Sequence, residues 1–99
     1  MSAAWRIVAH EAGGPEVLAR EDMALPEPGP GEVRVRHTAI GVNYIDTYHR
    51  SGLYPRPFPS ALGTEGAGVV EALGPGVETV RTGQRIAYLP STPGTYASH

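Results

Sequence analysis

The sequence predicts a mostly β domain, and three observations support this prediction. Its 99 residues are the length of one small domain. The 13 glycines and 10 prolines lie between short apolar segments, where they are typical of turns. Several of those segments alternate apolar and polar residues, which is the pattern of half-buried strands.

The N-terminal third of the chain supplies two strands and a rigid loop. Residues 3–10 are rich in apolar and β-branched side chains and are expected to form the first strand. A turn over residues 11–17 leads to a second strand over residues 17–25. Three prolines in residues 26–32 remove backbone donors and fix φ, so this segment is expected to be a surface loop.

The clearest strand covers residues 32–43. The Val-Arg-Val-Arg sequence at 33–36 places the valines on one face and the arginines on the other. Beyond Thr38 the segment is apolar throughout, so this end of the strand is expected to enter the core.

A short helix of about two turns is predicted over residues 43–52. Asn43 is a good N-cap, Asp46 lies near the positive end of the helix, and Gly52 fits the position after its last turn. Three prolines then make residues 53–62 extended.

The second half of the chain continues as strands and turns. Residues 66–73 are predicted to form a buried strand that ends in a Gly-Pro-Gly turn at 74–76. A second turn at 82–83 precedes a strand over residues 85–90. Residues 91–99 begin another loop and strand, so the pattern is expected to be incomplete at its C-terminal end.

Composition argues against several classes of function. The formal net charge is −2 with no basic block, which argues against nucleic acid as a partner. No apolar run approaches the roughly 18 residues of a membrane span, and no secretory leader pattern is present, so a cytoplasmic protein without membrane contact is expected. Without cysteine there is no disulfide or thiolate metal site. The four histidines have no metal-ligand spacing, and each is expected on the surface or in a loop: His10, His37, His49 and His99.

The glycine-rich segment 62–76 raises the question of a phosphate-binding loop. Its glycines at 63, 66 and 68 have the order G-x-x-G-x-G, whereas a dinucleotide fingerprint has G-x-G-x-x-G between a strand and a helix. A β-branched run and a turn follow here, and no helix is expected. We therefore interpret these glycines as sites of close backbone approach or of a bulge in a curved sheet.

Polar and aromatic side chains are concentrated in and after the predicted helix: Asn43, Asp46, Tyr48, His49, Arg50 and Tyr54. Their spacing admits either a functional cluster or a helix cap with a solvated face. Glu65 is either a surface carboxylate in a turn or a buried, paired one. No nucleophile motif is present, and nothing in the sequence supports Asp46 and Glu65 as the pair of a two-carboxylate hydrolase.

Three blocks, in order, resemble a known family. They are GVNYIDTYHRSGLYP at 41–55, LGTEGAGVVEALGPGV at 62–77 and GQRIAY at 83–88, with GGPEVL at 13–18 before them. They resemble the N-terminal catalytic domain of medium-chain dehydrogenases/reductases, and especially the zinc-free quinone oxidoreductases related to zeta-crystallin. The resemblance implies a GroES-like, partly open β-barrel with short helices over residues 1–99. In the whole enzyme a Rossmann domain that binds NADPH would follow, and the last part of the chain would complete the catalytic domain.

The resemblance also implies the site residues. Zinc-dependent relatives have Cys where Asn43 stands and His where Thr64 stands, so the resemblance implies the branch without zinc. The implied catalytic residues are Asn43, Asp46, Tyr48 and Tyr54. Asn43, Tyr48 and Thr64 would line the nicotinamide side of the cleft, and Glu65 would lie beneath it.

The implied reaction is hydride or electron transfer from NADPH to a quinone, by a homodimer in the full-length protein. The 99-residue chain without the cofactor domain is expected to be inactive. A related zinc-free reductase of enones or enoyl thioesters is an alternative. A stand-alone GroES-like binding or co-chaperone module is an alternative of another class.

Overall fold

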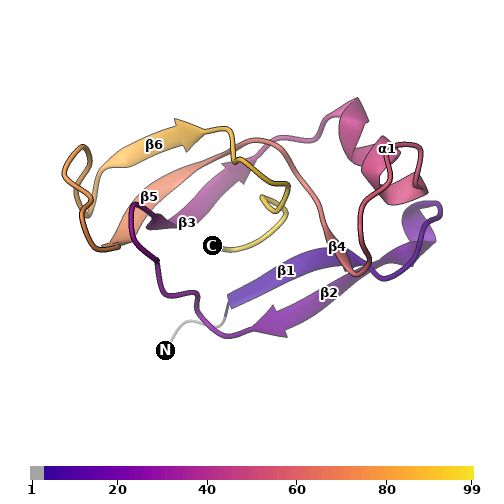
Figure 1. The fold of residues 1–99 in the computed structure, drawn as a ribbon, viewed down its shortest axis with the longest axis horizontal. Helices are drawn as coiled ribbons and strands as arrows, with labels where there is room; N and C mark the ends of the chain where they lie inside the picture. Colours follow the sequence, from indigo (N-terminus) through magenta and orange to yellow (C-terminus); the bar gives the residue numbers. More distant parts are fainter. Residues whose placement is uncertain (1–3) are drawn as a thin grey trace.

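Two three-stranded antiparallel sheets make up most of the fold in the computed structural model, which describes residues 4–99 (Figure 1). One sheet has the order β2 (Leu18–Met23), β1 (Ala4–Ala9), β4 (Ser60–Ala61). The other has the order β3 (Val33–Ile40), β5 (Gly66–Leu73), β6 (Arg85–Tyr88). A 3-10 turn, η1 (Pro15–Val17), and one helix, α1 (Tyr44–Ser51), complete the elements. Within residues 4–99 no helix has the length and apolar character that a membrane crossing needs.

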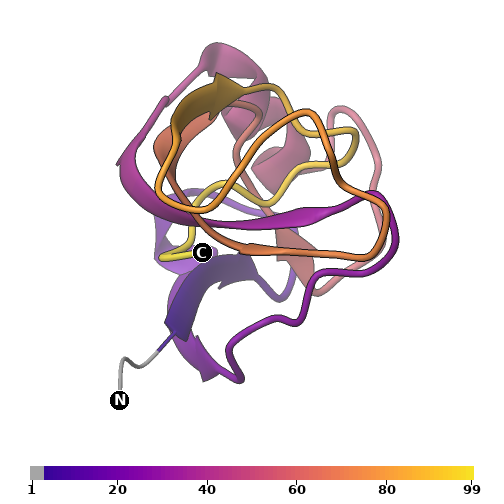
Figure 2. The ribbon, with the colours of Figure 1, turned by 90° about the vertical axis from the view of Figure 1, so that its left-hand side faces the viewer.

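The C-terminal segment 95–98 joins the two sheets. On one side, Ile7 of β1 donates its backbone N–H to the Tyr96 carbonyl at 2.7 Å. On the other side, His37 of β3 donates its backbone N–H to the Ser98 carbonyl at 2.9 Å. Both views show this yellow segment running between the sheets (Figures 1 and 2). The predicted mostly β, partly open barrel is therefore confirmed.

The core lies between the two sheets. Its side chains come from both of them and from the segments that join them, because each sheet has one face covered by the other. The most buried apolar residues are Ala4, Val8, Ala9, Val35, Leu62, Val70 and Ala97.

The predicted helix is confirmed, as are strands β1, β2, β3, β5 and β6, and β5 occupies the predicted residues 66–73. Strands β3 and β6 end at Ile40 and Tyr88, before the predicted ends at residues 43 and 90. Strand β4 was not predicted, and the strand expected in residues 91–99 is only an isolated bridge between Arg6 and Ala97. Ala3, included in the first predicted strand, lies outside the described residues. Helix α1 begins after its N-cap residue Asn43 and ends at Ser51, before its C-cap residue Gly52. The φ of Gly52 is +87°, in the left-handed region that favours glycine.

One expectation for β3 is wrong. The strand does not enter the core beyond Thr38: Ala39 is exposed, Ile40 is 37% exposed, and Val42 is 78% exposed. The register with β5 shifts between His37 and Ala39, so the strand leaves the covered part of the barrel at this point. Apolar composition predicted burial here, but burial requires a second layer, and residues 4–99 supply none over this end.

The interpretation of the glycine-rich segment is confirmed. It continues as strand β5 and a turn, and no helix follows it. Gly68 lies beside the register shift, where an added Cβ would lie 2.1 Å from the Arg36 carbonyl oxygen of β3. Glycine is needed here because the neighbouring backbone occupies the space of a side chain.

The expectation of surface or loop histidines is right for His10, which is exposed, and for His99, which lies outside the helices and strands. His37 is half-buried on β3. His49 is 8% exposed, because it shares the inward face of α1 with Asp46. The His99 side chain is 3% exposed, because it packs against the ion pairs of Glu71.

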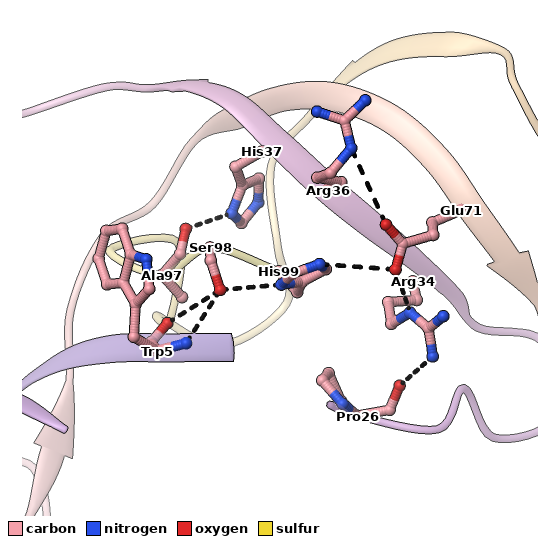
Figure 3. A network of polar contacts seen from close by, with 9 residues as sticks. All are labelled: Trp5, Pro26, Arg34, Arg36, His37, Glu71, Ala97, Ser98 and His99. Atoms are coloured by element: carbon pink, nitrogen blue, oxygen red, sulfur yellow. Dashed lines mark hydrogen bonds and ion pairs between the residues drawn. The ribbon is translucent and has the colours of Figure 1, made fainter. Parts of the chain in front are cut away.

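These ion pairs form a network where the two sheets meet (Figure 3). Glu71 of β5 accepts from Arg34 Nε at 2.9 Å and also faces Arg36 Nε at 3.9 Å and His99 Nε2 at 3.5 Å. Next to His99, Ser98 Oγ accepts the backbone N–H of Trp5 at 2.9 Å. The carboxylate of Glu71 thus connects β3 and β5 to the segment that joins the sheets.

Glu71→Gln is expected to lower the free energy of unfolding by about 1–2 kcal/mol. The Arg34 side chain is only 13% exposed and would lose its charged partner. The loss of stability is limited, because the amide of the new glutamine retains one acceptor oxygen. Urea denaturation measures the loss. Glu78→Gln makes the same charge change at an exposed position and is the control, expected to stay within about 0.5 kcal/mol of the parent. Equal losses in the two variants would show that the network contributes nothing specific.

Candidate functional site

The site begins at the N-terminus of α1, where Asp46 holds the first turn. The Asn43 backbone N–H donates to Asp46 Oδ2 at 2.9 Å, and the Asp46 backbone N–H donates to the Asn43 carbonyl at 3.0 Å. Asn43 has the extended conformation of an N-cap residue, and Asp46 is only 3% exposed. Asp46 therefore faces into the domain, where it fixes the backbone of Asn43.

The Asn43 side chain reaches the segment before β5. Its Nδ2–H donates to Glu65 Oε2 at 2.9 Å, and the Glu65 carbonyl accepts the backbone N–H of Gly41 at 3.2 Å. An added Cβ on Gly41 would lie 2.3 Å from the Glu65 side chain, so Gly41 provides the space for this carboxylate. Glu65 is exposed and also paired, which answers the question that the sequence left open.

Tyr96 completes this hydrogen-bonded set. Its hydroxyl donates to Asp46 Oδ2 at 2.6 Å, across 50 positions of sequence. Burial, reinforced by the bond to the Asp46 carboxylate, raises the pKa of the Tyr96 hydroxyl well above its usual range. The hydroxyl therefore stays protonated and remains a donor at neutral pH. Sequence reasoning did not single out Tyr96, because nothing local to residues 91–99 indicates its partner.

The two other predicted catalytic residues, Tyr48 and Tyr54, form a separate aromatic pair. Their ring centroids are 5.3 Å apart in an edge-to-face arrangement, and the Tyr54 N–H donates to the Tyr48 carbonyl at 3.3 Å. Tyr54 is 51% exposed. Helical geometry points Tyr48 away from Asp46, since residues two positions apart on a helix differ in direction by about 200°. The Tyr54 ring also lies near His49 of the inward face, with ring centroids 6.4 Å apart.

An open groove of about 420 Å³ lies beside Glu65, across the ends of β3, β5 and β6. Its base contains a row of small residues, because Ala39 pairs with Ala67 and Ala67 pairs with Ala87. The remaining lining residues are Ile40, Gly41, Glu65, Gly66, Tyr88 and Leu89. Small apolar side chains on a sheet leave a flat surface, which suits a planar ring.

Tyr88, in the groove lining, also connects to the barrel interior through His37. His37 Nδ1 lies 2.7 Å from the Ala97 carbonyl, which can only accept, so Nδ1 carries a proton. The other ring nitrogen, Nε2, hydrogen-bonds to the Tyr88 hydroxyl at 2.6 Å. Burial raises the pKa of Tyr88, which keeps this hydroxyl a donor.

Thr64, the remaining predicted residue, lies between Gly63 and Glu65 and is half-buried. An amide, a hydroxyl and one carboxylate are a poor donor set for zinc, which binds thiolate, imidazole and carboxylate groups. Residues 4–99 contain no group of three histidine or acidic side chains placed to hold a metal ion.

A comparison with known families places this architecture. Residues 29–98 match the family described as the alcohol dehydrogenase GroES-like domain. The chain belongs to this family. The GroES-like barrel implied by the three sequence blocks is therefore confirmed.

Individual members of the family are also similar to this GroES-like domain. The quinone oxidoreductase of Salmonella typhimurium is 53% identical over 96 residues, which are 96% of this chain and 29% of that protein. The structure of the Escherichia coli quinone oxidoreductase complexed with NADPH has a TM-score of 0.88 and 46% identity, covering 94% of this chain and 29% of that one. The 2-haloacrylate reductase of a Burkholderia species is 44% identical over 91% of this chain and 28% of that protein. The chain thus spans less than a third of the length of these relatives.

Proposed function

We propose that this GroES-like domain is the N-terminal catalytic domain of a quinone reductase that uses NADPH and no metal ion. The observation that carries the proposal is the Asn43 carboxamide held on Glu65 beside an open, flat groove. The likeness to quinone oxidoreductases over nearly the whole chain supports it. The amide and hydroxyl at Asn43 and Thr64 stand where zinc-dependent relatives are expected to have metal ligands.

The residues present fit one side of the cofactor. Asn43, Tyr48 and Thr64 offer amide and hydroxyl groups to the nicotinamide side. The N-terminus of α1 does not offer a phosphate site, because the Asp46 carboxylate already occupies that end of the helix. We propose that the phosphates bind to the Rossmann domain that the family resemblance implies for the whole protein. NADPH supplies the hydride when it is bound.

The domain's own contribution is to position the substrate. A quinone ring can lie flat on the alanine row, beside the Tyr88 ring that lines the same groove. Tyr48 and Tyr54 are not among the residues that line this groove. Holding two planar rings in contact provides most of the rate gain for hydride transfer. The reduced quinone oxygen also needs one proton, which water or one of these tyrosine hydroxyls supplies.

A second candidate function is reduction of a conjugated carbon–carbon double bond. The likeness to 2-haloacrylate reductase favours it. A flat groove beside polar groups accepts a small conjugated carbonyl compound as well as a quinone. For both candidate functions we propose that the whole protein is a cytoplasmic homodimer. Native mass measurement tests the dimeric state.

The test is a chimera in which residues 1–99 replace the matching segment of the Salmonella quinone oxidoreductase. The chimera is expected to oxidise NADPH in the presence of a benzoquinone, followed by absorbance at 340 nm. The chain without the remainder of that enzyme is expected to show no turnover. Asn43→Ala in the chimera is expected to lower kcat/KM about tenfold, because it removes the side chain that faces Glu65.

Two outcomes of the chimera assay would contradict the first candidate function. Turnover with 2-haloacrylate and none with any quinone would replace the first candidate by the second. A folded chimera that reduces neither class, while the unaltered Salmonella enzyme is active in the same assay, would overturn both.

A further inference from the structure

We propose that Tyr96 is a positioning residue for this site: its hydroxyl holds the Asp46 carboxylate, which in turn fixes Asn43, the residue bonded to Glu65 of the groove lining. The inference rests on the proposed function, because it concerns the same site. Its basis is a continuous set of hydrogen bonds from the barrel interior to the surface. Tyr96 bonds Asp46 at 2.6 Å, Asp46 bonds the Asn43 backbone at 2.9 Å, and Asn43 bonds Glu65 at 2.9 Å.

Tyr96 is a rigid starting point for this set. Its backbone N–H donates to the Leu62 carbonyl at 2.9 Å, and its carbonyl accepts the Ile7 N–H at 2.7 Å. Leu62 is 1% exposed. The ring passes so close to Gly63 that an added Cβ there would lie 2.7 Å from Tyr96 Cδ1. Tyr96 is thus held by backbone on two sides, and its hydroxyl has little freedom to move.

The Asp46 carboxylate depends on this hydroxyl for its orientation. Oδ2 accepts from both the Tyr96 hydroxyl and the Asn43 N–H. Oδ1 is buried and has no hydrogen-bond partner within residues 4–99. Both donors act on the same oxygen, so removal of one leaves a single bond about which the carboxylate can turn. A buried oxygen without a partner favours such a turn, because it gains any donor it can reach.

The orientation of Asp46 then reaches the groove through Asn43. The Asn43 backbone is anchored by the carboxylate, and the side chain of the same residue bonds Glu65 at the groove. A small shift of this backbone moves the carboxamide away from Glu65, which lines the groove. A small displacement of a side chain near the reacting centre lowers the rate of reaction, while substrate binding changes less.

The protonation state of the Tyr96 hydroxyl supports its role in holding Asp46. The raised pKa of Tyr96, due to burial and then to the Asp46 carboxylate, keeps the hydroxyl a donor through neutral and mildly alkaline pH. Arg50, on the same helix, has a smaller and opposite effect on this pKa. The bond to Asp46 therefore persists over the pH range in which the enzyme would be assayed.

The experiment is Tyr96→Phe in the chimera with the Salmonella enzyme, with Tyr44→Phe as the matched control. Both changes remove one hydroxyl, but Tyr44 is 83% exposed. Tyr96→Phe is expected to lower kcat about tenfold while KM for the quinone changes less than about twofold. Tyr44→Phe is expected to leave both values unchanged. A loss of thermal stability with unchanged kcat would reduce Tyr96 to a structural residue and overturn the proposal.

A double variant tests whether Tyr96 acts through Asp46. Asp46→Ala is expected to lower kcat by itself, and adding Tyr96→Phe is expected to lower it no further, because the acceptor of the Tyr96 hydroxyl is already absent. Two losses that multiply would contradict the proposal. This cycle requires an active chimera.

If the parent chimera folds but has no activity, the proposed function fails and the positioning role is judged by NMR. The Asn43 backbone and side-chain amide resonances are then expected to shift in Tyr96→Phe and not in Tyr44→Phe. Unshifted Asn43 resonances would overturn the role of Tyr96.

Discussion

Gly68→Ala is expected to lower the free energy of unfolding by about 3 kcal/mol. The added Cβ would lie 2.1 Å from the Arg36 carbonyl oxygen and 2.9 Å from His37 Cα, both in the backbone of β3. Relief requires a backbone shift, because no flexible side chain is involved. β5 cannot easily make that shift, since it is the central strand and is paired with β3 and β6 on its two sides. Urea denaturation of the variant and its parent measures the effect.

Gly94→Ala is the matched control for this substitution. Its nearest new contact would be Ala61 Cβ at 4.0 Å, an ordinary van der Waals distance. Its free energy of unfolding is expected to stay within about 0.5 kcal/mol of the parent. If Gly68→Ala is as stable as Gly94→Ala, the close approach between β3 and β5 does not constrain the fold as we infer.

Asp46→Ala is expected to lower the free energy of unfolding by about 3 kcal/mol and to abolish most activity of the chimera. Two donors lose their common acceptor: the backbone N–H at the start of α1 and the Tyr96 hydroxyl. The hydroxyl of the half-buried Tyr96 is left without its acceptor, which costs more than the loss of a fully exposed bond. Urea denaturation measures the first effect, and NADPH oxidation with a benzoquinone measures the second.

Two further variants test the cause of this loss. Asp22→Ala removes an exposed carboxylate from β2 and is expected to leave stability and activity close to the parent. Asp46→Asn keeps one acceptor oxygen and is expected to lose about half as much stability as Asp46→Ala. An Asp46→Ala variant no less stable than Asp22→Ala would show that the buried carboxylate is not needed to hold α1.

Much of the fold could be predicted because its signals are local. Alternation of apolar and polar residues identified the strands, and β5 occupies the residues predicted for it. Helix α1 followed from Asn43 at one end and Gly52 at the other, since each residue satisfies a requirement of its own backbone position. The glycines of 62–76 were assigned to the sheet because no helix could follow them.

The site could be predicted only in part. The sequence singled out Asn43, Asp46 and Glu65, but a polar residue near a helix can equally be a cap. The structure shows that Asp46 is both buried and a cap, and that Asn43 and Glu65 contact each other. Tyr48 and Tyr54 contact each other instead, in an edge-to-face arrangement.

The sequence by itself determined most elements of this protein: helix α1 with both ends, the turns, and strands β1, β2, β3, β5 and β6. Only the tertiary structure decided which distant residues meet, as Tyr96 meets Asp46 and His99 meets Glu71. It also decided that the apolar end of β3 is exposed. The physical reason is that local backbone preferences act over a few neighbouring residues, whereas these contacts depend on how segment 95–98 joins the two sheets.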